Sequence, residues 1–259
     1  MAQRLKDKVV IVTGASRGLG EYCARKYGEE GAIVVVAART EAETNPKLPG
    51  TIHSVVAAIE EAGGRAMAVA CNVADQASID AMVAKVLERY GRIDVLMNNA
   101  GILPPGNLSS IQTKHWDLEI KINFNGPFYA TRAVLPAMLE QKSGSVINIS
   151  SVAADRLSGA YGVIKRGLEA MTMGFAEEHK GDGIAFNALK PVGAIDTPGM
   201  HFGSDDPERF AGLPKPDSYV EAATLLALAT PATCTGGVFN DLEALARLAD
   251  EVTKRRFGV

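Results

Sequence analysis

The sequence is poor in the residues that build metal sites and disulfides. Its 259 residues include three cysteines and four histidines. Cys23, Cys71 and Cys234 are odd in number, scattered along the chain and without C-x-x-C spacing, so we expect buried free thiols rather than disulfides or metal ligands. The histidines show no metal-binding pattern either. The sequence therefore predicts no metal site.

Long apolar runs and an excess of basic charge are also missing. No run approaches the ~20 apolar residues of a membrane-spanning helix, and no apolar signal segment precedes the first expected strand. The net charge is -3, without a stripe of lysine and arginine, so we expect neither nucleic acid nor a membrane as a partner. Apolar residues make up 47% of the chain. We expect a soluble, cytoplasmic protein with one domain over residues 1–259.

Apolar, strand-like runs alternate with amphipathic runs along the chain. The expected strands lie near 8–13, 32–38, 66–71, 93–98, 144–149, 184–189 and 237–240. The expected helices lie near 18–30, 51–62, 75–90, 112–141, 159–180 and 217–229, followed by a helical tail over 241–255. Strands rich in valine and isoleucine are typical of sheets covered on both faces. The pattern predicts an α/β fold with a doubly wound, Rossmann-like parallel sheet.

Sheets of this kind bind ligands beyond the carboxyl ends of their strands. Gly14, Asn99, Ser151 and Pro191 each follow one of the expected strands. We therefore expect one cleft to collect the motifs that contain these residues.

A glycine-rich segment joins the first expected strand to the first helix. Gly14 follows Thr13 at the end of the strand, and Gly18 and Gly20 open the helix. Glycines permit a tight turn and a close approach of phosphate, and the start of a helix favours anions. A plain strand-to-helix turn would explain one or two glycines but not three. The segment therefore predicts a site for a dinucleotide pyrophosphate.

Tyr161 and Lys165 are four residues apart, so a helix places them on one face. A free phenol ionises near pH ~10, and a neighbouring cation favours its phenolate. We expect Lys165 to lower the pKa of Tyr161 and make it an acid or base at physiological pH. The pair alone is weak evidence, because a solvated tyrosine packed along a lysine stem is the commoner arrangement.

Taken together, these motifs resemble the short-chain dehydrogenase/reductase family, of the single-domain type. The glycine motif T-G-x-x-x-G-x-G matches residues 13–20, N-N-A-G matches 98–101, and the strand end NISS lies at 148–151. The family's tyrosine and lysine match Tyr161 and Lys165, and its helix asparagine matches Asn123. The resemblance covers residues 8–197. It implies nicotinamide-dependent alcohol and carbonyl chemistry.

The resemblance also implies roles for single residues. Tyr161 would move the proton while hydride passes between nicotinamide C4 and a carbonyl or carbinol carbon. Lys165 would hold the nicotinamide ribose, Ser151 would bond the reacting oxygen, and Asn123 would hold a water next to Lys165. The residues expected at the cofactor are Gly14, Ser16, Arg17, Gly18, Leu19, Gly20, Arg39, Asn72, Val73, Asn99, Ala100, Gly101, Tyr161, Lys165, Pro191, Ile195 and Thr197.

The end of the second strand bears on the choice of cofactor. NAD binders of this plan carry an acidic residue there, whereas this chain has Ala38 followed by Arg39. Arg39 and Arg17 could clamp a 2'-phosphate, since guanidinium groups match phosphate oxygens. We expect NADP(H) rather than NAD(H). Asn72 replaces the family's usual aspartate near the adenine, and its amide oxygen is still an acceptor.

Three segments bear on the choice of catalytic serine and on the substrate. Ser151 lies only ten residues before Tyr161, which leaves Ser150 as an alternative working serine. The stretch NPKLPGTIHS after the second strand resembles a steroid-dehydrogenase-like branch, although a plain polar loop before a helix at Thr51 explains it equally. Residues 198–218 resemble the family's substrate lid, with Met200, His201, Phe202 and Phe210 as possible pocket-wall residues.

These observations favour an NADP(H)-dependent oxidoreductase that interconverts a secondary alcohol and a ketone. One alternative is a 3-oxoacyl thioester reductase, against which acidic Asp205, Asp206 and Glu208 argue mildly. Another is a non-catalytic NADP-sensing protein, which the intact tyrosine, lysine, serine and asparagine set disfavours. The expected partners are a small-molecule substrate and copies of this chain, because helices 112–141 and 159–180 carry surplus apolar positions that suit a homodimer or homotetramer.

Overall fold

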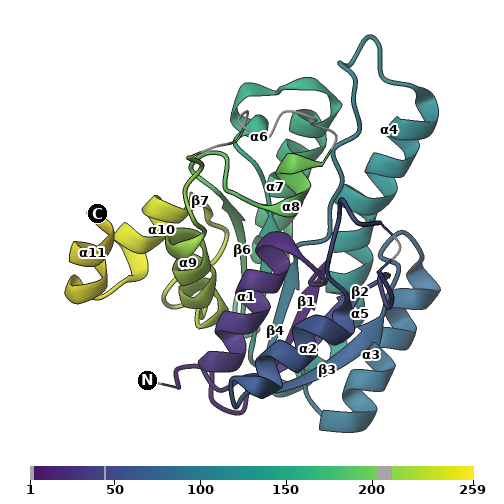
Figure 1. Ribbon diagram of the computed structural model, residues 1–259. Helices are drawn as coiled ribbons and strands as arrows, with labels where there is room; N and C mark the ends of the chain where they lie inside the picture. Colours follow the sequence, from purple (N-terminus) through teal and green to yellow (C-terminus); the bar gives the residue numbers. More distant parts are fainter. Residues whose placement is uncertain (1–2, 44, 203–209, 211) are drawn as a thin grey trace.

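The computed structural model describes residues 3–43, 45–202, 210 and 212–259 (Figure 1). In these residues one parallel sheet has the strand order β3-β2-β1-β4-β5-β6-β7. The strands are β1 (Val9–Thr13), β2 (Ile33–Ala38), β3 (Arg65–Ala70), β4 (Val95–Asn98), β5 (Gly144–Ile149), β6 (Ile184–Lys190) and β7 (Val238–Asn240). The expected Rossmann-like fold is confirmed, and every expected strand is present.

Helices cover both faces of the sheet, which explains why its strands are so apolar. All residues of β1, β5 and β6 are buried. One face packs against α1 (Gly18–Glu29), α2 (Ile52–Glu61) and α9 (Asp217–Ala227). The other face packs against α3 (Gln76–Tyr90), α5 (Gly126–Gln141) and α7 (Gly159–Glu178). The apolar core therefore forms two layers, one on each side of the sheet.

Two expected helices differ from the observed ones. The helix expected over 112–141 consists of α4 (Thr113–Ile120), a π-helical turn η1 (Lys121–Asn125) and α5. The expected tail consists of α10 (Asp241–Leu248) and α11 (Glu251–Phe257), because Asp250 caps a new helix by accepting a hydrogen bond from Thr253 N at 2.7 Å. Two short helices, α6 (Ala153–Arg156) and α8 (Pro198–His201), were not expected.

The topology places the carboxyl ends of the central strands next to one another. The chain builds β1, β2 and β3 outward on one side, and β4 then returns to pair with β1 on the other. The carboxyl ends of β1, β4 and β5 therefore lie side by side, at the edge where Figure 1 shows α6 and α8. A switch in strand order of this kind leaves a crevice in which α/β proteins bind ligands.

No helix among the described residues has the length and apolar character needed to cross a membrane.

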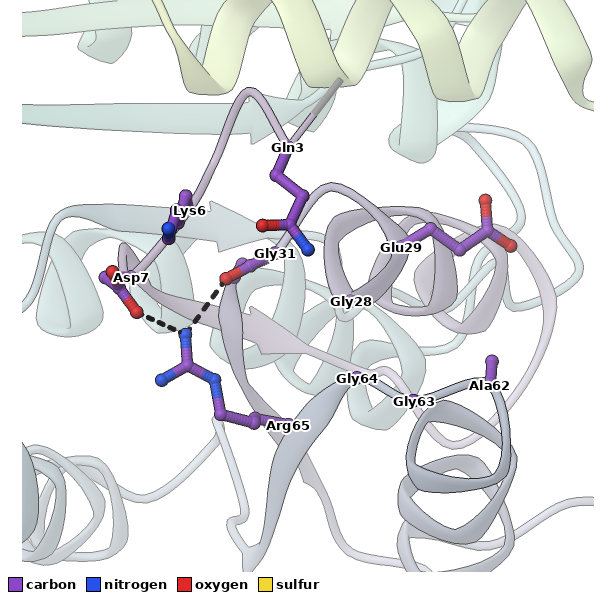
Figure 2. A pocket seen from close by; sticks show the side chains of 11 residues that line it. Gln3, Lys6, Asp7, Gly28, Glu29, Gly31, Ala62, Gly63, Gly64 and Arg65 are labelled. Atoms are coloured by element: carbon purple, nitrogen blue, oxygen red, sulfur yellow. Dashed lines mark hydrogen bonds and ion pairs between the residues drawn. The ribbon is translucent and has the colours of Figure 1, made fainter. Parts of the chain in front are cut away.

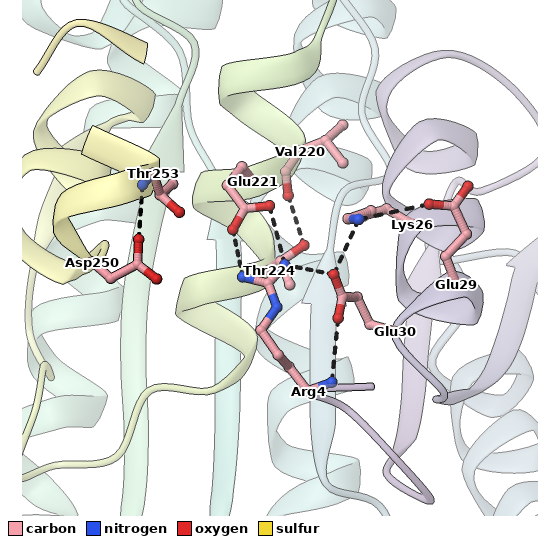
Figure 3. Close-up of polar contacts among 9 residues, drawn as sticks. All are labelled: Arg4, Lys26, Glu29, Glu30, Val220, Glu221, Thr224, Asp250 and Thr253. Carbon is pink, nitrogen blue, oxygen red and sulfur yellow. Dashed lines mark hydrogen bonds and ion pairs between the residues drawn. The ribbon is translucent and has the colours of Figure 1, made fainter. Parts of the chain in front are cut away.

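Arg4 ties the N-terminal segment to two helices on one face of the sheet (Figure 3). Its guanidinium donates to Glu30 Oε1 at 2.6 Å and to Glu221 Oε1 at 2.5 Å. Lys26 Nζ also lies 3.0 Å from Glu30 Oε1. Burial alone would raise the pKa of Glu30, but the hydrogen bonds from Arg4 and Lys26 outweigh it and lower the pKa to about 2. The cluster therefore joins the end of α1 to α9.

We expect Arg4→Met to lower the free energy of unfolding by about 1–3 kcal/mol, because Glu30 and Glu221 lose a charged partner while largely buried. The pKa of Glu30 is lower in the folded protein than its ordinary 4.5, so its ion pairs stabilise the fold above that pH. This stabilisation is lost as the pH falls through about 2. Urea denaturation should therefore show a smaller difference between variant and wild type at about pH 3 than at about pH 7.

Arg25→Met is the matched control, since Arg25 forms an exposed pair with Glu21 at 3.4 Å on the same helix. Its effect should stay below about 1 kcal/mol. An Arg4→Met effect as small as that of the control, or one that does not change with pH, would contradict this interpretation.

Candidate active site at the carboxyl ends of the strands

The glycine turn packs directly onto the end of β4. Gly14 has a φ of +65°, and a Cβ atom there would lie 2.7 Å from the Cα of Ala100. A Cβ atom on Gly20 would lie 2.4 Å from Asn99 Nδ2. Neither position has space for a side chain, so the turn and the N-N-A-G segment form one tight surface.

Hydrogen bonds hold this surface together. Thr13 Oγ1 accepts from the backbone N–H groups of Asn99 and Ala100, both at 3.1 Å. Asn99 Nδ2 donates to the carbonyls of Thr13 at 2.9 Å and Gly14 at 3.2 Å. The Asn99 amide, expected at the cofactor, thus also braces the glycine turn. Sequence reasoning assigned no role to the Thr13 hydroxyl, although its position at the end of β1 could have suggested one.

The start of α1 fits a pyrophosphate. Arg17 precedes the helix and forms no side-chain cap to its first N–H groups. Gly18 has a φ of +61°, and a Cβ atom there would lie 3.7 Å from Thr197 Cβ. Unpaired N–H groups at a helix start bind anions, and the missing side chain leaves the approach open. Ser16 is buried beneath this turn, and Leu19 is partly buried in it.

The three residues expected near the adenosine half of the cofactor have different surroundings. Arg17 donates to the carbonyls of Pro49 at 3.1 Å and Gly50 at 2.8 Å, so it fastens the loop before α2 to the glycine turn. This engagement occupies part of the guanidinium that we expected to clamp a 2'-phosphate. Arg39 is exposed directly after β2. Asn72 Oδ1 accepts from the backbone N–H of Ala74 at 3.2 Å, so its acceptor is already in local use.

Three further residues expected at the cofactor lie near the carboxyl ends of the strands. The carbonyl of Val73 would be 3.0 Å from a Cβ atom on Gly126, so the segment after β3 touches the start of α5. Pro191 follows β6, and Ile195 beyond it is buried.

Tyr161 and Lys165 occupy successive turns of α7, with Lys165 Nζ 5.6 Å from the centroid of the Tyr161 ring. Lys165 is buried and donates from Nζ to the carbonyl of Ile149, the last residue of β5, at 2.6 Å. Ser151 follows β5, and its hydroxyl lies close enough to the Tyr161 hydroxyl to lower the pKa of that group. The expected tyrosine, lysine and serine are therefore brought together at the end of β5.

Asn123 completes the group from the side of η1. Its amide exchanges hydrogen bonds with the backbone of Ile102, accepting at 2.9 Å and donating at 2.8 Å. A Cβ atom on Gly101 would lie 3.1 Å from Asn123 Oδ1 and 3.8 Å from Lys165 Nζ. Gly101 thus lets the end of β4 pass between the asparagine and the lysine.

The two neighbouring serines face different environments. Ser150 is buried and donates to Glu169 Oε1 at 2.7 Å, while Glu169 also pairs with Lys190 at 3.4 Å. Ser150 therefore belongs to an interior polar cluster, and Ser151 is the serine beside Tyr161.

The short connection between Ser151 and Tyr161 is closed by a single helical turn, α6. Leu157 ends this turn in the left-handed region, with a φ of 48°. A Cβ atom on Gly162 would lie 2.4 Å from the carbonyl of Ala153, so glycine allows α6 to pack against the first turn of α7. This packing explains how ten residues suffice to return the chain to the serine.

Glu119 is a part of this region that sequence reasoning missed. It lies on α4, one turn before Asn123, and is completely buried. Its Oε1 lies 3.5 Å from Asn123 Nδ2, and its Oε2 has no hydrogen-bond partner among the described residues. The spacing to Asn123 was the available signal, since positions four apart share a helix face.

Burial governs the acid–base properties of the site. It lowers the pKa of Lys165 to about 8, with the Glu119 carboxylate acting in the opposite direction. Burial raises the pKa of Tyr161, the hydrogen bond with Ser151 lowers it, and Glu119 raises it further. The expectation of a lowered Tyr161 pKa is therefore wrong for this structure, because desolvation of the phenolate outweighs the groups that favour it.

The segment expected to be a substrate lid begins at α8. His201 Nε2 lies 2.7 Å from Asp196 Oδ1, and the His201 ring meets Phe210 edge to face at 5.4 Å between centroids. Met200 is partly buried and Phe202 is half exposed. The acidic residues used against a thioester substrate, Asp205, Asp206 and Glu208, lie outside the described residues.

A cavity of about 450 Å³ lies far from this group, at the amino ends of the strands (Figure 2). Gln3, Lys6, Gly28, Gly64 and Arg65 are among its lining residues. The Arg65 guanidinium is engaged there with Asp7 at 2.6 Å and with the carbonyl of Gly31 at 3.2 Å. It shares no residue with the serine, tyrosine and lysine group, so it is separate from the candidate active site.

Comparisons with known proteins agree with the fold and the motifs. The short chain dehydrogenase family model matches residues 8–207. Hydroxysteroid dehydrogenase-like protein 2 of Homo sapiens is 38% identical over 202 residues, which cover 76% of this chain and 48% of the relative. The chain thus spans about half the length of the curated relatives it matches.

Two solved structures are also similar. A metagenomic short-chain oxidoreductase in complex with NADP is 32% identical with a TM-score of 0.76, covering 92% of this chain and 98% of that one. The 3-ketoacyl-(acyl-carrier-protein) reductase of Brucella melitensis, complexed with NADH, is 29% identical with a TM-score of 0.79, covering 91% and 97%. The chain belongs to the short-chain dehydrogenase family of oxidoreductases.

Proposed function

We propose that the protein is an NADP(H)-dependent oxidoreductase that interconverts a secondary alcohol and a ketone. The observation that carries the proposal is the convergence of Ser151, Tyr161, Lys165 and Asn123 on one edge of the sheet, beside a glycine turn open to phosphate. The family is one of oxidoreductases, and this chain retains each group that the chemistry requires.

Each group has a task in the proposed reaction. In ketone reduction, Tyr161 Oη gives its proton to the carbonyl oxygen, and in alcohol oxidation it takes the proton back. Ser151 donates a hydrogen bond to the same oxygen, on which negative charge develops. The Lys165 ammonium stabilises the phenolate that remains. Asn123 fixes the backbone at Ile102, next to Gly101, by two hydrogen bonds. The bound nicotinamide would supply or accept the hydride.

The preference for NADP(H) is supported by the end of β2. Ala38 ends the strand where NAD binders of this plan carry an acidic residue, and exposed Arg39 follows it. A guanidinium at this place suits the 2'-phosphate. The two structural relatives include one complex with NADP and one with NADH, so the preference rests on this chain's own residues.

The relatives support two substrate classes, both of which contain a ketone. The curated relatives are named hydroxysteroid dehydrogenase-like, which supports a bulky, apolar secondary alcohol or its ketone. A 3-oxoacyl thioester is the second candidate, favoured by the likeness to the Brucella melitensis reductase. The two classes differ in the anionic carrier group of the thioester, so a substrate panel separates them.

We further propose a homodimer or homotetramer built by α5 and α7 packing against their copies. A hollow of about 450 Å³ lies between these helices, lined by Phe128, Leu135 and Met171 among others. Leu139 on α5 and Met173 on α7 are exposed nearby in sequence. Light scattering should give the mass of two or four chains, and the mass of one chain would contradict the assembly.

Wild-type protein should oxidise NADPH in the presence of a ketone, followed at the nicotinamide absorbance band. We expect Tyr161→Phe to lower kcat by about 10²–10⁴-fold, because the proton donor is lost while the ring and its packing remain. NADPH binding should persist in the variant, which shows that the fold is intact. Turnover by Tyr161→Phe at the wild-type rate, or no turnover by wild type across hydroxysteroid, simple ketone and 3-oxoacyl thioester substrates, would overturn the proposal.

Arg39→Asp tests the cofactor preference. It should lower kcat/KM for NADPH by about 10–100-fold, since a charge-assisted bond to the 2'-phosphate is replaced by repulsion. The value for NADH should hold or rise, because a carboxylate can accept from the ribose hydroxyls. Arg25→Asp, the same change at an exposed site on α1, is the control. Equal losses with both cofactors would contradict the assignment of Arg39.

A further inference from the structure

Glu119 is a buried acid without a matching hydrogen-bond partner. Its side chain is completely inaccessible to solvent, its Oε1 has one long contact with Asn123 Nδ2 at 3.5 Å, and its Oε2 has no partner among the described residues. A carboxyl group buried in this way is costly unless a nearby charge compensates it. Asn123 is neutral, so it does not compensate the charge of the carboxylate.

Lys165 supplies that charge from the neighbouring helix. It is also buried, and Nζ donates to the Ile149 carbonyl at 2.6 Å. No carboxylate of the described residues lies within ion-pair distance of Nζ. Burial raises the pKa of Glu119 and lowers that of Lys165, and the charge of each group opposes this change in the other. Asn123 lies near both groups: its Nδ2 is 3.5 Å from Glu119 Oε1, and a Cβ atom on Gly101 would lie 3.1 Å from its Oδ1 and 3.8 Å from Lys165 Nζ.

The other titratable groups around Glu119 are few. Tyr161 faces it from α7, and its pKa is raised by the carboxylate. His115 lies one turn earlier on α4, half-buried, with Nδ1 unpartnered among the described residues. The segment 102–112 contains no titratable side chain. Lys165 is thus the only fixed positive charge among these neighbours in the described residues.

We propose that Glu119 is a positioning residue that keeps Lys165 in its charged form and so sets the pH range of the reaction. The effect on turnover rests on the proposed function, whereas the effect on Lys165 does not. Removing the carboxylate withdraws a negative charge from Lys165 and Tyr161, so the pKa of each group should fall. The buried ammonium would then lose its proton nearer to neutral pH.

The first test measures Lys165 in protein without cofactor or substrate. The 13Cε resonance of Lys165, assigned with Lys165→Arg, is titrated by NMR in wild type, Glu119→Gln and Asp117→Asn. We expect Glu119→Gln to lower the pKa of Lys165 by about one unit. Asp117→Asn removes the same charge from the exposed face of the same helix and should leave the Lys165 pKa unchanged. An unchanged Lys165 pKa in Glu119→Gln would overturn the inference.

The second test is the pH profile of ketone reduction. Reduction needs protonated Tyr161, so kcat falls as the pH rises through the pKa of Tyr161. Because removal of the Glu119 carboxylate lowers this pKa, Glu119→Gln should move the fall to lower pH by about one unit. KM for the ketone should not change. A purely structural role would lower kcat at every pH without moving the profile, and that result would contradict us. Glu119→Met, also neutral and of similar size, gives the same test if the glutamine variant does not fold.

The two proposals fail in different ways. If wild type reduces no ketone, the proposed function is wrong, but the NMR titration still decides whether Glu119 controls Lys165. If wild type is active and both the Lys165 pKa and the pH profile are unmoved in Glu119→Gln, only the inference about Glu119 is wrong.

Discussion

The hydrogen bond from Lys165 Nζ to the Ile149 carbonyl is the interaction on which the candidate site depends. It fixes the rotation of α7 against the end of β5, so Tyr161, one turn earlier, comes to lie beside Ser151, which follows the same strand. Burying an ammonium is costly, and one carbonyl does not compensate the charge. The acid–base properties of the site therefore depend on the charged groups that offset this burial.

The sheet supplies the other half of the arrangement. Because β1 and β4 are neighbours, the glycine turn meets the N-N-A-G segment, and glycines at 14 and 20 allow contact that a Cβ atom would prevent. The glycine turn and the candidate proton-transfer groups therefore share one wall, with Gly101 at their junction. In the proposed reaction, this contact would place a dinucleotide bound at the glycine turn beside Tyr161 and Lys165.

The parts of the fold and of the candidate site that depend on neighbouring residues along the chain could be predicted from the sequence. Strands rich in valine and isoleucine, the cap at Thr51 and the spacing of Tyr161 and Lys165 all depend on neighbours along the chain. The π-helical turn at 121–125 could not be predicted, because the helical pattern of the sequence continues through these residues. The contact of Arg17 with the loop at Pro49 depends on a long-range packing arrangement. The burial of Glu119 likewise depends on long-range packing, since α4 contacts α7.

The decisive measurement is a crystal structure of the complex with NADP. We expect Lys165 Nζ to keep its bond to Ile149 and to reach the nicotinamide ribose, with the Tyr161 hydroxyl and Ser151 facing the nicotinamide and the 2'-phosphate at Arg39. A cofactor whose ribose lies out of reach of Lys165, or a Tyr161 hydroxyl turned away from Ser151, would contradict it.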